Sequence, residues 1–172
     1  MAKKRASKSS KAESTAPPHD AAEAMVDRAS IVAQSVQIKE IFAEEYQASR
    51  LPAGFDTADN INVKMNVGRI EIGFPDDRET DLEFSVRVLF SLQARTKGSD
   101  ADSPPVVAIE CGFVLIYAVP SFEELDDEGL KAFARTSGVF NAWPYWREFV
   151  QSACTRLAVP TLRVPTFRLP SK

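Results

Sequence analysis

The sequence predicts an α+β protein in which an antiparallel sheet precedes two helices packed on one side of it. Residues 81–95 alternate apolar and polar side chains, as in a strand with one buried face. Residues 106–119 begin in the same way and become apolar on both faces, which predicts a strand covered on both sides. Residues 139–157 place apolar and aromatic side chains at helical spacing, and the prolines within 158–170 exclude any continuation of that helix. This order, strands first and helices afterwards, is typical of an α+β domain.

The N-terminal part of the chain is predicted to lie outside this domain. Residues 1–20 contain Lys, Ser, Ala and Pro and only one large apolar side chain, so we expect a disordered basic and polar tail. The only histidine, His19, lies in it without ligand partners and is interpreted as solvated. Residues 21–35 are rich in alanine and are predicted to form a helical extension.

Charge is distributed unevenly along the sequence. Five of the 21 basic residues lie in residues 1–11, so the rest of the chain has 16 basic residues against 24 acidic ones. An acidic domain binds nucleic acid poorly, and only the tail could serve as a nucleic-acid adaptor, through salt-sensitive contacts.

The first half of the domain contains one ambiguous segment and one clear strand. Residues 36–48 fit either a helical stripe or a bulged strand, and their Glu and Ala content favours a helix. Residues 51–60 have the composition of a loop. Residues 61–67 alternate strictly, and the phase flips at Gly68 before the alternation resumes over 70–74, which predicts a bend or a bulge at the glycine.

Both helices have candidate start signals. Ser121 and Glu124 are spaced as a capping box, which predicts a helix beginning there. Asn141 is a candidate cap for the second helix, with Pro144 in its first turn, where no intrahelical donor is lost.

The sequence shows no catalytic constellation. It has no glycine-rich phosphate loop, no Cys/His cluster, and no Ser or Cys with a candidate base beside it. Cys111 and Cys154 lie in apolar contexts and are interpreted as reduced, buried thiols. We therefore expect a non-enzymatic protein without a cofactor or a metal. No run is long enough to span a membrane, and nothing resembles a secretory signal, so we expect a cytoplasmic protein.

Taken in order, the segments of residues 36–168 resemble the protein-export chaperone SecB and its SecB-like relatives. The resemblance rests on VQIKEIFAEEY, LEFSVRVLFSL and AIECGFVLIYAV, on a Pro-Tyr-x-Arg-Glu signature at 144–148, and on a Val-Pro-x-Leu segment at 159–162. It implies a SecB-like chaperone domain over 36–172, with a four-stranded antiparallel sheet and two C-terminal helices packed on one side. It also implies a strand at 36–48, followed by a crossover loop over 51–60.

The resemblance further implies an ATP-independent chaperone that holds unfolded polypeptides and assembles as a homotetramer, a dimer of dimers. The implied client groove lies between the crossover loop and the loop that enters the last helix. Its candidate lining residues are Leu51, Phe55, Val139, Phe140 and Trp143. Val139, Phe140 and Trp143 are alternatively interpreted as core, and for Trp143 the two interpretations are equally supported.

The natural partner stays open at this stage. Glu45 and Glu83 correspond to the sheet acids that contact the export motor SecA in SecB. However, SecB proteins typically end in an acidic tail, whereas Arg163, Arg168 and Lys172 lie near the end of this sequence. A SecB-like chaperone that protects the antitoxin of a toxin–antitoxin pair is therefore an alternative. A small-ligand or lipid-binding module is a further alternative from a different class.

Overall fold

The computed structural model describes residues 19–51, 60–100 and 102–167. Its strands are β1 (Gln37–Arg50), β2 (Ile61–Gly73), β3 (Glu83–Thr96) and β4 (Val107–Ala118). Its helical segments are α1 (His19–Ser35), α2 (Asp127–Phe133), the π-helix η2 (Ala134–Gly138) and α3 (Val139–Arg156). Phe55 and the basic residues of the N-terminal tail lie outside the described residues.

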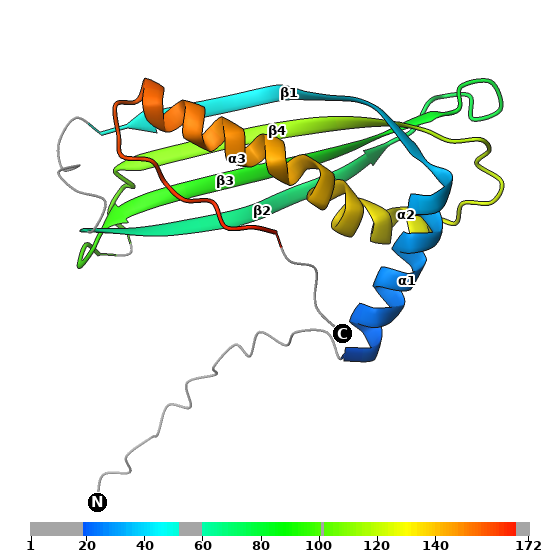
Figure 1. Cartoon of the computed structure of the whole chain (residues 1–172), viewed down its shortest axis with the longest axis horizontal. Helices are drawn as coiled ribbons and strands as arrows, with labels where there is room; N and C mark the ends of the chain where they lie inside the picture. The colour runs from blue at the N-terminus through cyan, green and yellow to red at the C-terminus, as the bar shows by residue number, and fades with distance from the viewer. Residues whose placement is uncertain (1–18, 52–59, 101, 168–172) are drawn as a thin grey trace, which may run out of the picture.

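The four strands form one antiparallel sheet in the order β1-β4-β3-β2 (Figure 1). β2, β3 and β4 follow one another as a meander, whereas β1 pairs with β4 at the opposite edge from β2. β1 and β2 are thus consecutive in the chain but lie at opposite edges of the sheet, and most of the crossover loop predicted between them lies outside the described residues. The segment that was ambiguous from local propensity is thus a strand, and the predicted bulge in β2 is present between Val67 and Ile70.

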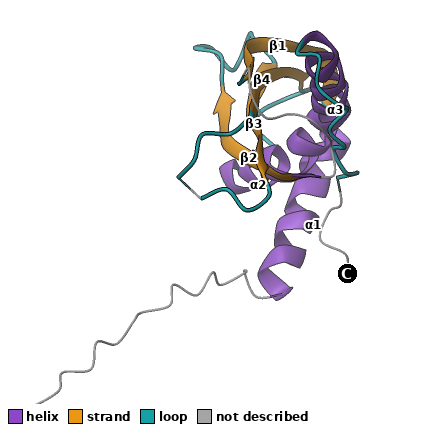
Figure 2. Cartoon of the chain, turned by 90° about the vertical axis from the view of Figure 1, so that its left-hand side faces the viewer, coloured by secondary structure: helices purple, strands orange, loops and turns teal. Residues whose placement is uncertain are grey.

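Helix α3 lies along one side of the sheet, and Figure 2 shows the two layers from the end. α1 packs against α2 near one end of the sheet (Figure 1). The predicted α+β class and four-stranded antiparallel sheet are confirmed. The two C-terminal helices are joined by the π-helix η2 without an intervening loop, so the helical run extends from α2 to the end of α3.

Both predicted helix starts were wrong. α2 begins after Asp126, whose carboxylate accepts a hydrogen bond from the backbone N–H of Gly129 at 2.7 Å. Ser121 only accepts a local bond from the Glu123 N–H, at 3.1 Å. Asn141 does not cap α3, because its side-chain amide donates to the Tyr117 hydroxyl at 3.1 Å and the helix already begins at Val139. Pro144 consequently lies inside the helix.

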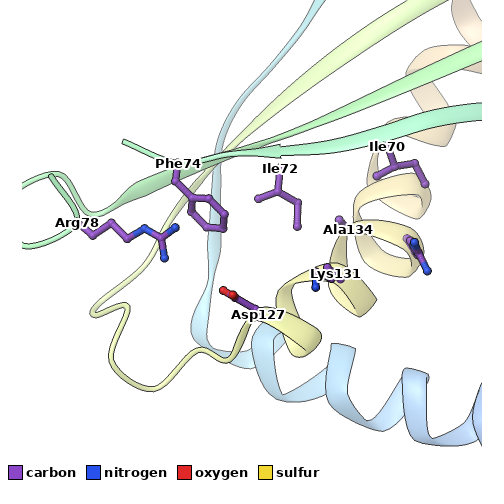
Figure 3. A pocket seen from close by; sticks show the side chains of 8 residues that line it. Ile70, Ile72, Phe74, Arg78, Asp127, Lys131 and Ala134 are labelled. Atoms are coloured by element: carbon purple, nitrogen blue, oxygen red, sulfur yellow. The ribbon is translucent and has the colours of Figure 1, made fainter. Parts of the chain in front are cut away.

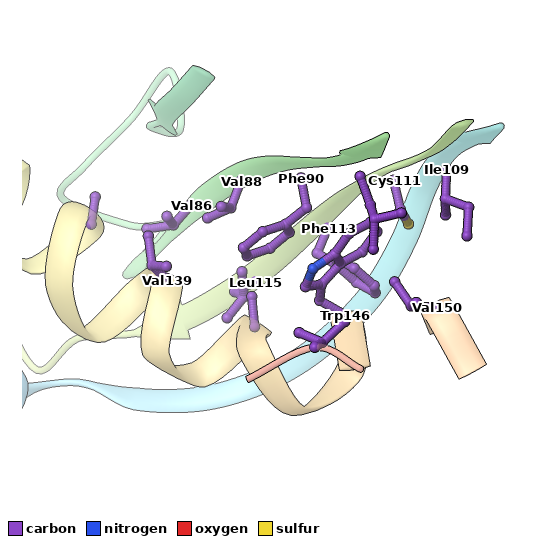
Figure 4. Close-up of a cluster of buried hydrophobic side chains, with 14 of the residues drawn as sticks. Val86, Val88, Phe90, Ile109, Cys111, Phe113, Leu115, Val139, Trp146 and Val150 are labelled. Atoms are coloured by element: carbon purple, nitrogen blue, oxygen red, sulfur yellow. The ribbon is translucent and has the colours of Figure 1, made fainter. Parts of the chain in front are cut away.

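The core fills the space between the sheet and α3. β3 and β4 supply every second side chain, and α3 supplies the opposite wall (Figure 4). Phe90 and Trp146 stack at its centre, with ring centroids 5.4 Å apart and planes 12° from parallel. Each large side chain buried in this way contributes roughly 1.5–3 kcal/mol. The alternation of 81–95 therefore reports the buried face of β3, from Phe84 to Ala94.

After α3 the chain turns back over the same face of the sheet. Ala158 has a positive φ of 51°, which reverses the chain direction. The C-terminal segment, residues 159–167, then runs back between α3 and β2 (Figure 1). Val159, Leu162 and Val164 are buried in the core. This segment completes the apolar layer that α3 begins.

Candidate binding surface

Aromatic side chains gather where the first turns of α3 meet the C-terminal segment. Phe140 is 53% exposed, and its ring centroid lies 6.3 Å from that of Phe167. The half-buried Trp143 lies between them and the core, with centroids 5.1 Å from Phe167 and 5.7 Å from Phe90. We call Phe140, Trp143 and Phe167 the aromatic surface.

Hydrogen bonds fix the C-terminal segment that supports this surface. The Trp143 indole Nε1–H donates to the backbone oxygen of Pro165 at 2.8 Å. At the other end of α3, the Arg50 guanidinium donates to the backbone oxygens of Leu157 and Ala158, at 3.0 and 2.9 Å. A side-chain cation at the last carbonyls of a helix satisfies acceptors that have no intrahelical partner. Phe167 is therefore presented by a segment anchored at both ends.

Val139 does not lie on an accessible surface. It is 1% exposed and packs in the core, on the side of α3 that faces the sheet (Figure 4). Of the two interpretations that the sequence allowed, core and groove, the structure favours core for Val139. We therefore do not include it in the proposed binding surface.

Leu51 and Phe140 lie at opposite ends of α3. Leu51 is 40% exposed and follows Arg50, which contacts the C-terminal end of the helix. Phe140 is the second residue of α3. Because a helix rises 1.5 Å per residue, the two side chains are separated by about 25 Å along the helix axis. Phe55, the other candidate groove residue from the predicted crossover loop, lies outside the described residues.

A second apolar strip, which the sequence analysis did not assign, lies where β1 faces α3. Tyr46 is 64% exposed, and its ring makes an edge contact with Phe149 at 5.7 Å. Tyr145 and Ile38 are also exposed. The only signal in the sequence was the presence of Tyr46 and Tyr145 in the segments that form this strand and this helix.

Glu45 and Glu83 lie on the helix-free face of the sheet, opposite β4 positions Gly112 and Ala118. These two positions are six residues apart, or about 20 Å along the strand. Glu83 is ion-paired with Lys39. The face also contains two interstrand ion pairs, which join Arg87 to Glu44 and to Glu71, and a pair within β2 between Arg69 and Glu71. It is therefore mixed in charge instead of uniformly acidic.

The buried thiols are unsuited to nucleophilic chemistry. Cys111 and Cys154 are buried and unpaired, and burial raises the pKa of the Cys111 thiol to about 12. A thiol with such a pKa carries almost no reactive thiolate at neutral pH. Within the described ranges, no three His, Cys, Asp or Glu side chains lie close enough together to hold a metal ion. None of the described helices is long and apolar enough to cross a membrane.

Comparison with known proteins agrees with this architecture. No protein-family model matches the sequence, and no curated protein matches it significantly. Among solved structures, the chain has the fold of SecB-like chaperones. One such structure is the SecB-like chaperone of Mycobacterium tuberculosis in complex with a ChAD peptide from the HigA1 antitoxin. The TM-score is 0.71 at 23% sequence identity, and the match covers 84% of this chain and 99% of that one.

A second structure, a Streptococcus agalactiae protein of unknown function, matches with a TM-score of 0.39 and 7% identity over 76% of this chain and 96% of that one. That likeness is too weak to carry an argument. The resemblance to SecB that the sequence segments indicated is confirmed at the level of the fold.

Proposed function

We propose that this protein is an ATP-independent chaperone that holds unfolded polypeptides on the aromatic surface. The observation that carries the proposal is the exposure of Phe140 beside Trp143 and Phe167, on a SecB-like fold. Unfolded chains present apolar side chains to water, and an apolar surface binds them without sequence specificity. We further propose that Leu51 and Phe55 extend this surface along α3, so that one client contacts several weak sites.

A light-scattering assay tests the proposal. A chemically unfolded test protein is diluted into buffer with and without this protein, in the absence of nucleotide. We expect an equimolar amount to suppress the aggregation of the test protein. Unchanged aggregation at a several-fold molar excess would sink the proposal.

We propose an antitoxin as the natural client. Support comes from the solved SecB-like neighbour, whose structure contains an antitoxin peptide. Delivery to SecA is the competing proposal. It is less well supported, because Glu83 already has Lys39 as an ion-pair partner and the surrounding face is mixed in charge.

Binding measurements with purified SecA separate these two proposals. If SecA is a partner, reversing the charge of Glu45 and Glu83 together should weaken its binding in a salt-sensitive way. If the unmodified protein does not bind SecA at all, the antitoxin proposal gains.

We propose a cytoplasmic homotetramer, a dimer of dimers. The outer edge of β1 has no partner strand among the described residues, and the strand has 14 residues, or about 45 Å of backbone along that edge. Long unpaired edges are normally covered or paired. A dimer of dimers needs two different interfaces, and the strip of Tyr46, Tyr145 and Ile38 is available as the second.

A further inference from the structure

A hollow with an apolar floor and a cationic rim lies between β2 and the start of the C-terminal helical run. Its volume is about 320 Å³. Ile70, Ile72 and Phe74 form the floor, and the helices α2 and η2 form the opposite wall (Figure 3). The three floor residues are half-buried and pack against the core. Such a hollow is large enough for one or two apolar side chains.

The rim is built from Arg78, Lys131 and Arg135, against the single carboxylate of Asp127. Lys131 is partly neutralised, because its Nζ lies 2.7 Å from Oε1 of Glu128. Within the part of the chain that the structure describes, neither arginine has a carboxylate within ion-pair distance. Two guanidinium groups at this hollow are thus available to an anion.

The arrangement of these cations carries its own electrostatic cost. Lys131 and Arg135 are four residues apart on one helical surface, and like charges at that spacing repel each other. The Arg78 guanidinium lies 3.8 Å above the Phe74 ring, which holds it over the apolar floor. A second hollow, between α1 and α2, shares Lys131 and Arg135 and adds Arg28. The basic groups therefore concentrate here although most of the chain is acidic.

We propose that this hollow binds a client segment in which acidic residues flank apolar ones. The apolar side chains would enter the hollow, and the flanking carboxylates would pair with Arg78 and Arg135. A guanidinium presents a planar fork of donors that matches a carboxylate. This inference rests on the proposed chaperone function and adds a preference in client sequence, separate from the aromatic surface.

Peptide binding to the full chain provides the test. The probe is a fluorescent peptide in which Asp and Glu flank Leu and Phe, and its matched partner has Asn and Gln in place of the acids. We expect the acidic peptide to bind more tightly, and to lose this advantage between 50 and 500 mM salt. Arg78→Gln and Arg135→Gln should each lower its affinity about threefold to fivefold, and together more than tenfold.

The control variant is Arg69→Gln. Arg69 is also an exposed arginine and lies on β2, but its ion-pair partner is Glu71 on the helix-free face. It should leave the affinity for both peptides unchanged. Because Arg135 makes no ion pair with a described residue, Arg135→Gln keeps the test valid even if Arg78→Gln disturbs Phe74.

The outcomes separate the two levels of the proposal. If both peptides bind equally, or if neither arginine substitution lowers the affinity for the acidic peptide, the inference about the hollow is overturned. The proposed chaperone function still stands in that case, provided that the protein suppresses client aggregation. Arginine-dependent binding of decanoate without binding of the acidic peptide would also overturn it, in favour of a small-ligand pocket. Failure to bind either peptide, together with failure to suppress aggregation, would refute the chaperone function itself.

Discussion

Replacing Phe140 and Trp143 by alanine should separate client binding from stability. Replacing a fully buried Phe or Trp by Ala lowers the free energy of unfolding by about 3–5 kcal/mol. Phe140 is 53% exposed and its described aromatic partner is Phe167, so Phe140→Ala should cost only about 1 kcal/mol. For a chain of this size, that lowers Tm by roughly 2–4 °C.

Trp143→Ala should behave differently, because Trp143 also supports the fold. It loses an edge contact with Phe90, a contact with Phe167, and the hydrogen bond to the Pro165 oxygen. Half-burial and one hydrogen bond together predict a cost of about 3 kcal/mol, and a Tm lower by roughly 6–12 °C.

The assay pairs a thermal melt with client binding for each variant. Phe140→Ala should weaken client affinity about fivefold or more at near-parental Tm, whereas Trp143→Ala should reduce both. Ile31→Ala is the matched control, since Ile31 is an exposed apolar residue, 63% accessible, on α1, which contributes no residue to the aromatic surface. If Phe140→Ala melts as low as Trp143→Ala and holds clients like the parent protein, the proposed surface is misplaced.

Three further predictions follow from single contacts. Arg50→Ala removes both bonds to the end of α3 and should lower the free energy of unfolding by about 1–2 kcal/mol; an unchanged urea midpoint would contradict this. Multi-angle light scattering should give a tetramer, and Tyr46→Lys should shift it towards smaller species; a monomeric parent at micromolar concentration would refute the assembly. Burial raises the pKa of Tyr117 to about 12 from 10.0, so the folded state binds this proton more tightly than the unfolded state. The stability that this proton contributes should be fully present below pH 10 and lost as pH rises towards 12. A Tm that does not change between pH 10 and 12 would contradict this prediction.

The predictability of this fold from sequence differed among its elements. One face of β3 is buried, so its apolar and polar side chains alternate in the sequence and predicted the strand. β1 gave no such signal, because nearly all of its residues are exposed in the single chain. Its strand state is imposed by pairing with β4. The residue pattern left a helix and a bulged strand open, and the resemblance to SecB decided for the strand. The sequence also indicated a second cover for β4, but both α2 and α3 pack on the core face of the sheet, where Phe133 contacts Tyr117 and Trp146 contacts Phe90.

The candidate sites were predictable only where one residue carried the signal. Phe140 and Trp143 were candidates because the resemblance to SecB implies a groove at the entry to the last helix, and their role in binding stays a prediction. The role of Arg50 depends on a contact with Leu157, 107 residues later in the chain. The cationic hollow combines β2, the turn that contains Arg78 and the helices α2 and η2. Both the Arg50 contact and the hollow join residues that are far apart in the sequence, so no local spacing of residues predicts them.

The π-helix η2 has a consequence for how this chain tolerates length changes. A π-helical turn contains one residue more than an α-helical turn. In an α-helix, each residue is rotated by about 100° around the helix axis relative to the one before it. Deleting one residue from η2 would restore regular winding and rotate either α2 or α3 away from the sheet. Gly138 lies so near β3 that an added Cβ would stand 3.0 Å from Val86, which leaves little room for such a rotation. The five residues of η2 thus set the rotation of α2 relative to α3, so that the apolar sides of both helices face the same sheet.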